Sequence, residues 1–428
     1  MTEDGWRIVG GSPLHGRVRA AGSKNGSLPT LAAALLADGK TVLHGVPRIA
    51  DVETMLALLR AFGLEVEWAG AALEIVNRGL ATHRAPEDLV RRMRASHYIL
   101  APVLARLGRV EVPLPGGCDI GQRPVDYILS GLESLGVDAS VRDDRIEASA
   151  KRLRGARVTL DPAYRSPGAT FSLLMAASLA EGVTVIENAS CEPDVVSFCR
   201  FLRSAGAQIE TAEETTLIVT GVDRLQGAEH SVNADRLEAG TLLCAAASTR
   251  GEVWVEGVPL RDLGRVADVL RAAGVEVRED GAGVCAACPG RPRAIAVATQ
   301  PYPGFPTDLQ PPLAAVLATA EGTSKVTETI FDRRLQYAQE LVKMGARIDV
   351  LDSRNALIHG VPRLHGATVE AQNIRDGAAL VVAALGAEGE SAVMGKRYIA
   401  RGYERLAEKL RALGAQIDEV AAQGDAAD

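Results

Sequence analysis

Polar side chains that could hold an anion recur at six similar positions in this 428-residue chain. Each lies 14 to 16 residues before a glycine that follows an Ala/Leu-rich stretch, which places it at the predicted start of a helix. The free amides of a helix start bind anions, and four of the six side chains are basic. The six residues are Lys24, Arg94, Ser166, Arg236, Asp308 and Arg375.

Ordinary helix capping is the alternative explanation for these positions. It suits Ser166 and Asp308, because serine and aspartate are good N-cap residues. It does not suit lysine or arginine, since a cation at a helix N-terminus opposes the helix dipole. The recurring basic residues therefore favour anion binding.

A glycine-rich loop at residues 112–126, VPLPGGCDIGQRPVD, is about four residues longer than the equivalent connections elsewhere in the chain. Insertions of this kind usually serve function. Cys118 is flanked by Gly117 and closely followed by Arg123, which favours an exposed, partly ionised thiol. We predict a chemical role for Cys118; the alternative is an incidental surface thiol.

Two further arginines, Arg334 and Arg401, precede later predicted helices at corresponding positions. Taken alone, each could be a surface salt-bridge partner. The pair Cys285 and Cys288 has no second cysteine pair or histidine cluster nearby, so no metal site is predicted.

The elements that position these residues form a repeating pattern. One set of glycines ends a helical pattern at intervals of 68 to 73 residues: Gly63, Gly136, Gly206, Gly274, Gly345 and Gly414. A second set is predicted to supply left-handed helix C-caps: Gly39, Gly108, Gly182, Gly251, Gly322 and Gly389. The intervening apolar periodicities predict a βαβαββ unit repeated six times.

Length and composition predict a globular protein of about two domains. The net charge of −7 disfavours nonspecific binding to nucleic acid or to an anionic membrane. The N-terminal sequence has no signal pattern and no run of eighteen apolar residues occurs, so we expect a cytoplasmic protein.

Five motifs resemble the UDP-N-acetylglucosamine 1-carboxyvinyltransferase family of enolpyruvyl transferases, a group that also includes EPSP synthase. They are S-K-N at 23–25, M-R-A-S at 93–96, L-P-G-G-C-D-I-G-Q-R-P-V-D at 114–126, F-P-T-D at 305–308 and R-G-Y-E-R at 401–405. The resemblance implies transfer of the enolpyruvyl group of phosphoenolpyruvate to the C3 hydroxyl of UDP-N-acetylglucosamine. Phosphate is released, in the first committed step of peptidoglycan synthesis.

The same resemblance implies an α/β fold, an inside-out α/β barrel of two globular domains with three βαβαββ repeats each and the active site in the cleft between them. One domain would be residues 22–233, with the Cys118 lid loop. The other would be discontinuous, formed by residues 1–21 and 234–428.

Roles for individual residues also follow from the resemblance. Lys24, Arg123 and Arg401 would hold phosphoenolpyruvate, helped by Arg334 and Arg375. Asn25 and Asp308 would meet the sugar hydroxyl, with Asp308 as general base and Cys118 as the acid of the lid. Further substrate contacts are implied for Arg94, Pro124, Val125, Asp126, Ser166, Gly168 and Ile330. No metal or organic cofactor is implied.

Three positions depart from the family pattern. Asn373 and Ala400 stand where the family has aspartate, and R-S-P-G-A-T at 165–170 replaces S-V-G-A-T after an apparent insertion. These changes leave open a paralogue that uses another uridine nucleotide, or a catalytically silent ligand-binding paralogue. The P-G-G-C loop argues against shikimate 3-phosphate, and the acidic charge argues against a nucleic-acid clamp. We expect the two substrates as partners, with no nucleic acid, membrane or obligatory protein partner.

Overall fold

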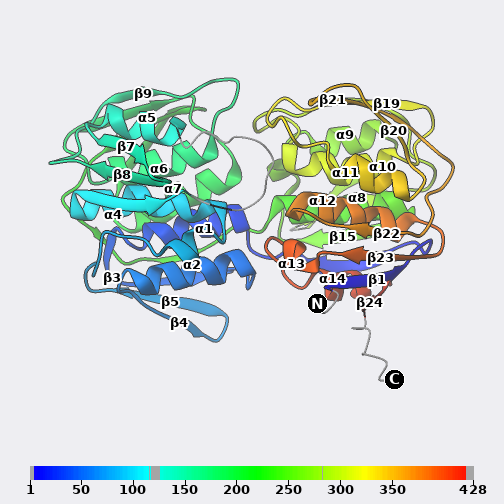
Figure 1. The fold of residues 1–428 in the computed structure, drawn as a ribbon, viewed down its shortest axis with the longest axis horizontal. Helices are drawn as coiled ribbons and strands as arrows, with labels where there is room; N and C mark the ends of the chain where they lie inside the picture. Colours follow the sequence, from blue (N-terminus) through cyan, green and yellow to red (C-terminus); the bar gives the residue numbers. More distant parts are fainter. Residues whose placement is uncertain (1–3, 115, 117–125, 282, 421–428) are drawn as a thin grey trace. The chain divides into compact units, whose positions relative to one another are not determined.

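The computed structural model describes residues 4–114, 116, 126–281 and 283–420. Their contacts divide the chain into two compact units (Figure 1). The first unit contains the N-terminal segment up to Ala21 and the chain from Asp235 onward, and the second contains most of the chain from Gly22 to Ala234. Gly22 and Ala234 form an isolated antiparallel bridge, so the chain enters and leaves the second unit at adjacent points.

Three mixed sheets lie in the described part of the first unit. Their strands are β1 (Gly5–Val9), β2 (His15–Arg19), β15 (Glu252–Glu256), β16 (Glu276–Asp280), β17 (Gly283–Ala287), β18 (Ala296–Ala298), β19 (Thr323–Thr327), β20 (Arg347–Val350), β21 (Asn355–His359), β22 (Thr368–Glu370), β23 (Glu390–Met394) and β24 (Gln416–Glu419). The strand orders are β2-β15-β17-β16, β18-β19-β21-β20 and β22-β23-β1-β24. In each sheet the first two strands are parallel and the other pairings are antiparallel.

The N-terminal strands complete two of these sheets. In β1, Trp6 lies opposite Val393 of β23 and Glu419 of β24, and in β2, Val18 lies opposite Val255 of β15. Trp6 and Val18 are buried. Backbone pairing and apolar burial therefore both assign the N-terminal segment to the first unit.

The second unit follows the same plan in its described part. Its strands are β3 (Ala37–His44), β4 (Glu65–Ala69), β5 (Ala72–Asn77), β6 (Arg109–Pro113), β7 (Asp138–Arg142), β8 (Arg145–Ser149), β9 (Arg157–Thr159), β10 (Val183–Glu187), β11 (Gln208–Glu213), β12 (Thr216–Thr220), β13 (Leu225–Gln226) and β14 (Glu229–Ser231). The orders are β9-β10-β12-β11, β13-β3-β5-β4 with β14 also on β3, and β6-β8-β7. A single parallel bridge between Arg84 and Glu111 of β6 takes the place of the parallel strand in the last sheet.

Helices connect these strands. Those of the first unit are α8 (Arg236–Thr249), η2 (Leu260–Leu263), α9 (Val266–Ala272), η3 (Thr307–Leu309), α10 (Gln310–Leu317), α11 (Tyr337–Lys343), α12 (Ile374–Gly386), α13 (Lys396–Ile399) and α14 (Leu406–Ala412). Those of the second are α1 (Lys24–Ala33), α2 (Ala50–Ala61), α3 (Glu87–Val90), η1 (Arg94–Ile99), α4 (Leu100–Leu107), α5 (Asp126–Ser134), α6 (Pro167–Ala177) and α7 (Pro193–Ser204). The predicted α/β class is confirmed. None of the helices in the described residues is long and apolar enough to span a membrane.

Helices α8, α10 and α12 pack against one another in the core of the first unit. Nearly every residue of the three is buried, including all of α10. A helix that carries small and apolar residues around its whole circumference is stable when other elements surround it. These three helices are therefore the central layer against which the first unit packs.

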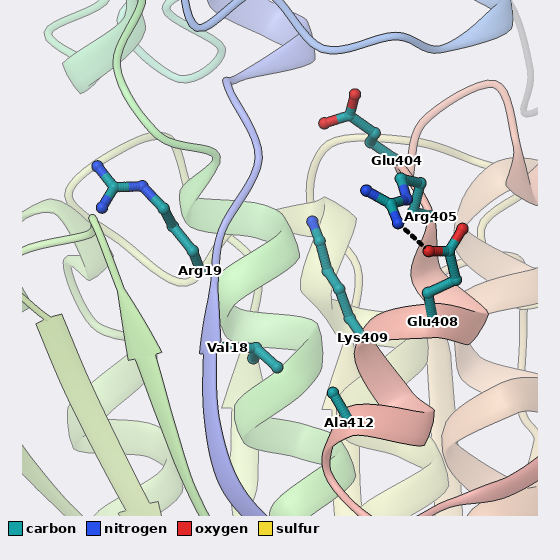
Figure 2. A pocket seen from close by; sticks show the side chains of 7 residues that line it. All are labelled: Val18, Arg19, Glu404, Arg405, Glu408, Lys409 and Ala412. Carbon is teal, nitrogen blue, oxygen red and sulfur yellow. Dashed lines mark hydrogen bonds and ion pairs between the residues drawn. The ribbon is translucent and has the colours of Figure 1, made fainter.

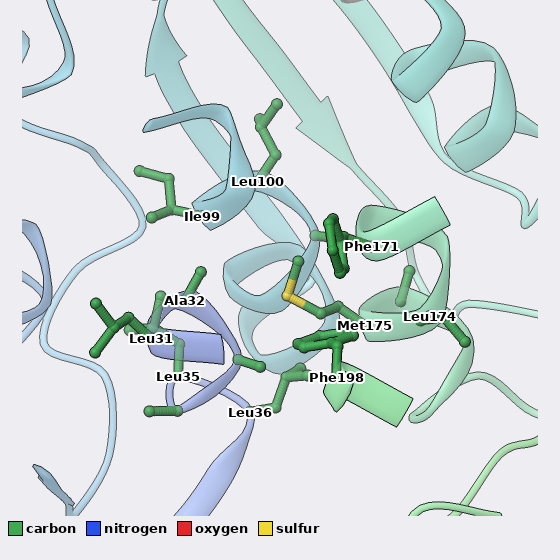
Figure 3. Packing of buried hydrophobic residues seen from close by; sticks show 14 of the residues in the cluster. Leu31, Ala32, Leu35, Leu36, Ile99, Leu100, Phe171, Leu174, Met175 and Phe198 are labelled. Atoms are coloured by element: carbon green, nitrogen blue, oxygen red, sulfur yellow. The ribbon is translucent and has the colours of Figure 1, made fainter. Parts of the chain in front are cut away.

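The second unit has an equivalent apolar core around α1, α4 and α6 (Figure 3). Leu31 from α1, Leu100 from α4 and Met175 from α6 are fully buried there. The rings of Phe171 and Phe198 meet edge to face, with centroids 5.1 Å apart. This aromatic contact joins α6 to α7 and adds to the burial energy of the core.

The first set of predicted glycines has the expected conformation. All six lie one residue beyond the C-cap position of a helix, with φ between +87° and +103°. The next strand begins two residues after each glycine. The predicted helix ends are thus confirmed at Gly63, Gly136, Gly206, Gly274, Gly345 and Gly414.

The prediction that the second set of glycines supplies helix C-caps is wrong for most of them. Only Gly108 is the C-cap residue of its helix, and Arg250 takes the left-handed conformation in place of Gly251. Helices such as α1 end earlier and continue into tighter turns, in which Leu35 N donates to Ala32 O and Leu36 N to Ala33 O. These turns carry the chain on to the glycine, which lies beyond the helix end. Gly39, Gly182, Gly322 and Gly389 do have positive φ, but at this later position.

Candidate active site

The six recurrent polar residues lie at helix starts, as predicted. Lys24 and Arg236 are the first residues of α1 and α8, Arg375 is the second of α12, and Ser166 is the N-cap of α6. Arg94 and Asp308 lie in the short 3-10 helices η1 and η3, which run directly into α4 and α10. The helical position is therefore common to the six residues, whereas their contacts differ.

Asp308 is held by two arginines from elsewhere in the first unit. Its Oδ1 accepts a hydrogen bond from Arg334, and its Oδ2 accepts one from Arg375 Nη2 at 3.1 Å. The N-cap residue of η3 is Pro306, and no side chain caps this helix. The capping explanation for Asp308 is therefore wrong, because its carboxylate is engaged by guanidinium groups.

Arg375 is 6 % exposed, and its interactions with neighbouring groups keep it charged. Burial opposes its charge, but Asp308 and Tyr403 favour it, and the pKa of Arg375 lies above its ordinary value. Its Nη1 donates to the Tyr403 hydroxyl at 3.0 Å, and that hydroxyl lies 2.9 Å from Thr241 Oγ1. Burial raises the pKa of Tyr403, so this group remains a neutral phenol.

Arg334 is also buried, at 2 % exposure. Its Nε donates to the Thr307 carbonyl at 3.3 Å, and its guanidinium lies 5.3 Å from the centre of the Phe331 ring. The planar guanidinium can make these contacts and bind Asp308 at the same time. We call Asp308, Arg334, Arg375 and Tyr403 the Asp308 cluster.

Asn373 and Asp376 occupy the start of α12 beside this cluster. The Asn373 side chain accepts from the backbone amides of Arg375 and Asp376, both at 3.0 Å, and its Nδ2 donates to Asp376 Oδ2 at 2.7 Å. Burial raises the pKa of Asp376 to about 6, although Arg334 and Asn373 oppose this shift. Asn373 thus caps α12 as an aspartate would. The carboxylate at this helix start belongs to Asp376, three residues further along the chain.

The Asp308 cluster combines two chemical capabilities. Two buried guanidinium groups present fixed donors that can hold phosphate or carboxylate oxygens. A carboxylate between them can accept a proton from a hydroxyl group. The first unit therefore carries groups suited to an anionic substrate and to activation of a hydroxyl nucleophile.

Lys24 forms the corresponding charged pair in the second unit. Its Nζ lies 2.9 Å from Asp51 Oδ2, and Asp51 is buried in the first turn of α2. Ser23 caps α1 by accepting from Gly26 N at 3.1 Å. The ion pair offsets the unfavourable placement of a cation at a helix start, and Asn25 is the next residue of the same helix.

Ser166 and Gly168 lie together at the start of α6. Ser166 Oγ accepts from Ala169 N at 3.2 Å, and Pro167 is the first helical residue. A Cβ at Gly168 would be 3.6 Å from His97 Nε2 and 4.0 Å from the Tyr98 hydroxyl. Capping is therefore correct for Ser166, and the start of α6 adjoins the aromatic residues of η1, which begins at Arg94.

The remaining predicted residues are spread over several segments. Arg401 lies in the turn between α13 and α14, two residues before Tyr403, and Ile330 N donates to Glu328 Oε1 at 2.8 Å. Asp126 is the first residue of α5. Cys118, Arg123, Pro124 and Val125 lie outside the described residues.

Comparison with known proteins identifies the family. The sequence matches the EPSP synthase (3-phosphoshikimate 1-carboxyvinyltransferase) family over residues 8–410. The chain belongs to the EPSP synthase family of enolpyruvyl transferases. It is 46% identical over 413 residues to UDP-N-acetylglucosamine 1-carboxyvinyltransferase 3 of Symbiobacterium thermophilum, which covers 96% of this chain and 97% of that protein.

Solved structures of other enolpyruvyl transferases have a similar fold. The enolpyruvyl transferase NikO from Streptomyces tendae superimposes with a TM-score of 0.89 at 26% identity, covering 99% of this chain and 100% of that one. EPSP synthase from Acinetobacter baumannii gives a TM-score of 0.72 at 19% identity, covering 97% and 100% of the two chains. This second likeness concerns the fold alone.

Sequence reasoning missed several residues that contact the predicted ones. Tyr403 lies inside the R-G-Y-E-R motif, so its proximity to Arg401 was a signal for it. Thr241 lies one turn into the buried helix α8, and Asp51 lies in α2. Neither carries a local signal, because each meets its partner only through helix packing.

A pocket of about 350 Å³ in the first unit has none of the predicted residues in its lining (Figure 2). It is lined by Val18, Arg19, Glu404, Arg405, Glu408, Lys409 and Ala412. Arg405 pairs with Glu408, and Lys409 pairs with the buried Glu238. These pairs largely neutralise the lining, so this pocket is not the candidate active site.

The buried cysteines of the described residues are not poised for chemistry. Burial raises the pKa of Cys199 to about 11 and that of Cys244 to about 12, so both remain thiols at neutral pH. Cys285 and Cys288 are also buried. Over the described ranges, no group of three or more His, Cys, Asp or Glu side chains could hold a metal ion.

Proposed function

We propose that this enolpyruvyl transferase moves the enolpyruvyl group of phosphoenolpyruvate to the C3 hydroxyl of UDP-N-acetylglucosamine and releases phosphate. The product would enter peptidoglycan synthesis. The named relative from Symbiobacterium thermophilum, 46% identical over 96% of this chain, supports the choice of acceptor. The observation that carries the chemistry is the position of Asp308 between Arg334 and Arg375.

The basic residues hold the phosphate and carboxylate of phosphoenolpyruvate in this proposal. Arg334 and Arg375 are buried and held by neighbouring groups, so they lose little conformational entropy when an anion binds. Lys24 is similarly held by Asp51. Arg123 and Arg401 complete the set.

Two proton transfers accompany formation of the carbon–oxygen bond. Cys118 donates a proton to C3 of the enol, which leaves C2 electron-poor. The acceptor hydroxyl then attacks C2, while Asp308 takes its proton and Asn25 orients it. The tetrahedral product loses a proton from C3 and breaks the C2–oxygen bond to phosphate, which restores the double bond.

The nucleotide is held by a second group of residues. Arg94, Arg123, Pro124, Val125 and Asp126 contribute, together with Ser166, Gly168 and Ile330. The position of Ser166 and Gly168 at the amino-terminal end of α6 supports this role, since the free backbone amides of a helix start can bind an anion.

The finer architecture is part of the proposal. Residues 22–233 form one enolpyruvyl transferase domain, and residues 1–21 with 234–428 form the other. Each is an inside-out α/β barrel of three βαβαββ repeats, six repeats in all. The shared strand order of the described sheets and the buried central helices support this arrangement. We place the enzyme in the cytoplasm.

Phosphate release with a panel of acceptors tests the function. We expect turnover of phosphoenolpyruvate with UDP-N-acetylglucosamine, and an enolpyruvyl product identified by mass. Other uridine nucleotides and shikimate 3-phosphate serve as competing acceptors in the same assay. Faster turnover with one of them would identify that compound as the acceptor. No turnover with any acceptor would support a catalytically silent ligand-binding protein.

Fosfomycin tests the role of Cys118. This epoxide alkylates the corresponding cysteine in the family, so we expect irreversible inactivation and one added equivalent of mass on the Cys118 peptide. Cys118→Ser should keep the fold but turn over far more slowly, because a hydroxyl is a much weaker acid than a thiol. Inactivation without modification of that peptide would assign the acid to another residue.

A further inference from the structure

We infer that Glu328 is a positioning residue for the proposed reaction. Its carboxylate fastens the turn that carries Asp308 to the turn that carries Ile330 and leads to Arg334. The inference rests on the proposed function, which makes Asp308 the base. It adds a residue that the sequence motifs did not indicate.

Glu328 follows β19 and is fully buried. Its Oε1 accepts hydrogen bonds from Thr299 Oγ1 at 2.9 Å, Ile330 N at 2.8 Å and Phe331 N at 3.1 Å. Its Oε2 accepts from Thr307 Oγ1 at 2.9 Å. A buried carboxylate is costly unless it is hydrogen-bonded, and four donors supply that compensation here.

All four donors are neutral groups, and they lie on three chain segments, because Ile330 and Phe331 are neighbours that closely follow Glu328. Thr299 is the first residue after β18, and it is also bound to Thr329, whose backbone amide donates to Thr299 Oγ1 at 2.8 Å. Thr307 precedes Asp308 in η3. Ile330 and Phe331 precede Arg334 in the chain. The Glu328 carboxylate is therefore the common acceptor that joins these segments.

The joined segments carry the two halves of the Asp308–Arg334 pair. Thr307 donates its hydroxyl to Glu328 and offers its carbonyl to Arg334 Nε at 3.3 Å. Asp308 and Arg334 are 26 residues apart in the chain. Loss of the Glu328 contacts would let one turn shift against the other. A shift of about 1 Å in a reacting group can slow a reaction by about 10²-fold.

Two isosteric variants separate positioning from general stability. Thr307→Val and Thr299→Val each remove one donor to Glu328, but only Thr307 adjoins Asp308. Thr299→Val also deprives the Thr329 amide of its acceptor, so it should lower the melting temperature at least as much. We expect Thr307→Val to lower kcat about tenfold or more, with KM for both substrates changed less than about threefold. Thr299→Val should keep kcat within about threefold of the wild type.

Replacement of Glu328 itself gives a second comparison. In Glu328→Gln the amide oxygen can still accept from Ile330, Phe331 and Thr299, and the amide nitrogen can donate to the Thr307 oxygen. In Glu328→Ala all four contacts are lost. We expect Glu328→Ala to lower kcat about 100-fold and Glu328→Gln to recover it to within about tenfold of the wild type. If Glu328→Ala does not fold, the comparison of Thr307→Val with Thr299→Val tests the positioning role by itself.

The experiment measures kcat, both KM values and the melting temperature by phosphate release and thermal unfolding, on the full chain. Equal losses of kcat in Thr307→Val and Thr299→Val, in step with melting temperature, would overturn the positioning role. So would a folded Glu328→Gln variant as slow as Glu328→Ala, because the negative charge of Glu328 and not its hydrogen-bond geometry would then matter. A wild-type enzyme that releases no phosphate would instead remove the proposed function, and this inference with it.

Discussion

Ser166 and Asp308 occupy equivalent places in the sequence pattern, yet the structure uses them differently. Ser166 binds locally, since its hydroxyl accepts from the amide of Ala169, three residues away. Asp308 binds Arg334 and Arg375, which are 26 and 67 residues away in the chain. A shared position at a helix start therefore does not fix a shared role.

The difference shows what distinguishes a residue that caps a helix from a residue that can take part in a reaction. A serine at a helix start finds its partner within its own turn, so its effect is on the stability of that helix. A carboxylate in contact with two buried guanidinium groups is fixed by tertiary packing and faces groups that can bind an anion. The substitutions below test whether the two kinds of position separate as this comparison requires.

Replacement of Asp308 should have the largest effect. We expect Asp308→Asn to slow phosphate release by about 10²–10⁴-fold, because the amide cannot accept the hydroxyl proton. The free energy of unfolding should fall by about 1–3 kcal/mol, since Arg334 and Arg375 lose a charged acceptor. Steady-state kinetics and thermal unfolding of the same variant measure both quantities.

Asp280→Asn is the matched control for this substitution. Asp280 forms an exposed ion pair with Arg17 in the same unit, so neither turnover nor stability should change appreciably. An Asp308→Asn enzyme that keeps most of its activity would remove Asp308 from the mechanism and make its position merely structural.

Asp376 extends the comparison to a carboxylate in the first turn of α12. Its pKa is raised by burial from 3.8 to about 6, so the folded protein favours the protonated form. This group therefore stabilises the fold below about pH 4, and the contribution is lost as pH rises through about 6. Between pH 4 and 7.5 the wild type should lose about 2–3 kcal/mol of unfolding free energy relative to Asp376→Asn. Denaturant unfolding of both proteins across this range measures the two free energies of unfolding. If they change with pH in parallel, Asp376 does not titrate as stated.

Lys24 tests a cationic helix start in the second unit. A charge-assisted hydrogen bond contributes about 1.5–3 kcal/mol, so Lys24→Ala should raise the KM for phosphoenolpyruvate by about 10- to 100-fold. Lys24→Arg keeps the charge and serves as the control. Calorimetry with acceptor present measures the affinity directly, and unchanged affinity in Lys24→Ala would leave the Asp51 ion pair as the only role of this lysine.

Ser166 should show the smallest effect on folding. Loss of its cap in Ser166→Ala should lower the unfolding free energy by about 1 kcal/mol, and Ser166→Asp should restore it, because aspartate caps equally well. The measurement is thermal unfolding without ligand. Equal stability of the alanine and aspartate variants would show that the hydroxyl contributes no capping energy.

Much of the local framework could be predicted from the sequence. The glycines at Gly63 and its five counterparts adopt the left-handed conformation one residue after the helix C-cap, because glycine adopts positive φ at little cost. The starts of α1, α8 and α12 were also predicted correctly. The end of α1 was predicted wrongly, because the Ala/Leu run continues past the helix through tighter turns that have the same composition.

The sequence by itself determined where helices such as α1 and α8 begin, that Gly63 and its five counterparts follow helix ends, and which family the motifs resemble, since each depends on residues close together in the chain. Only the tertiary structure decided that Asp308 binds arginines, that Lys24 meets Asp51, and that Glu328 joins three turns. These partners are brought together by packing around buried helices. Contacts between distant residues depend on how elements pack, and no local spacing in the sequence specifies that packing.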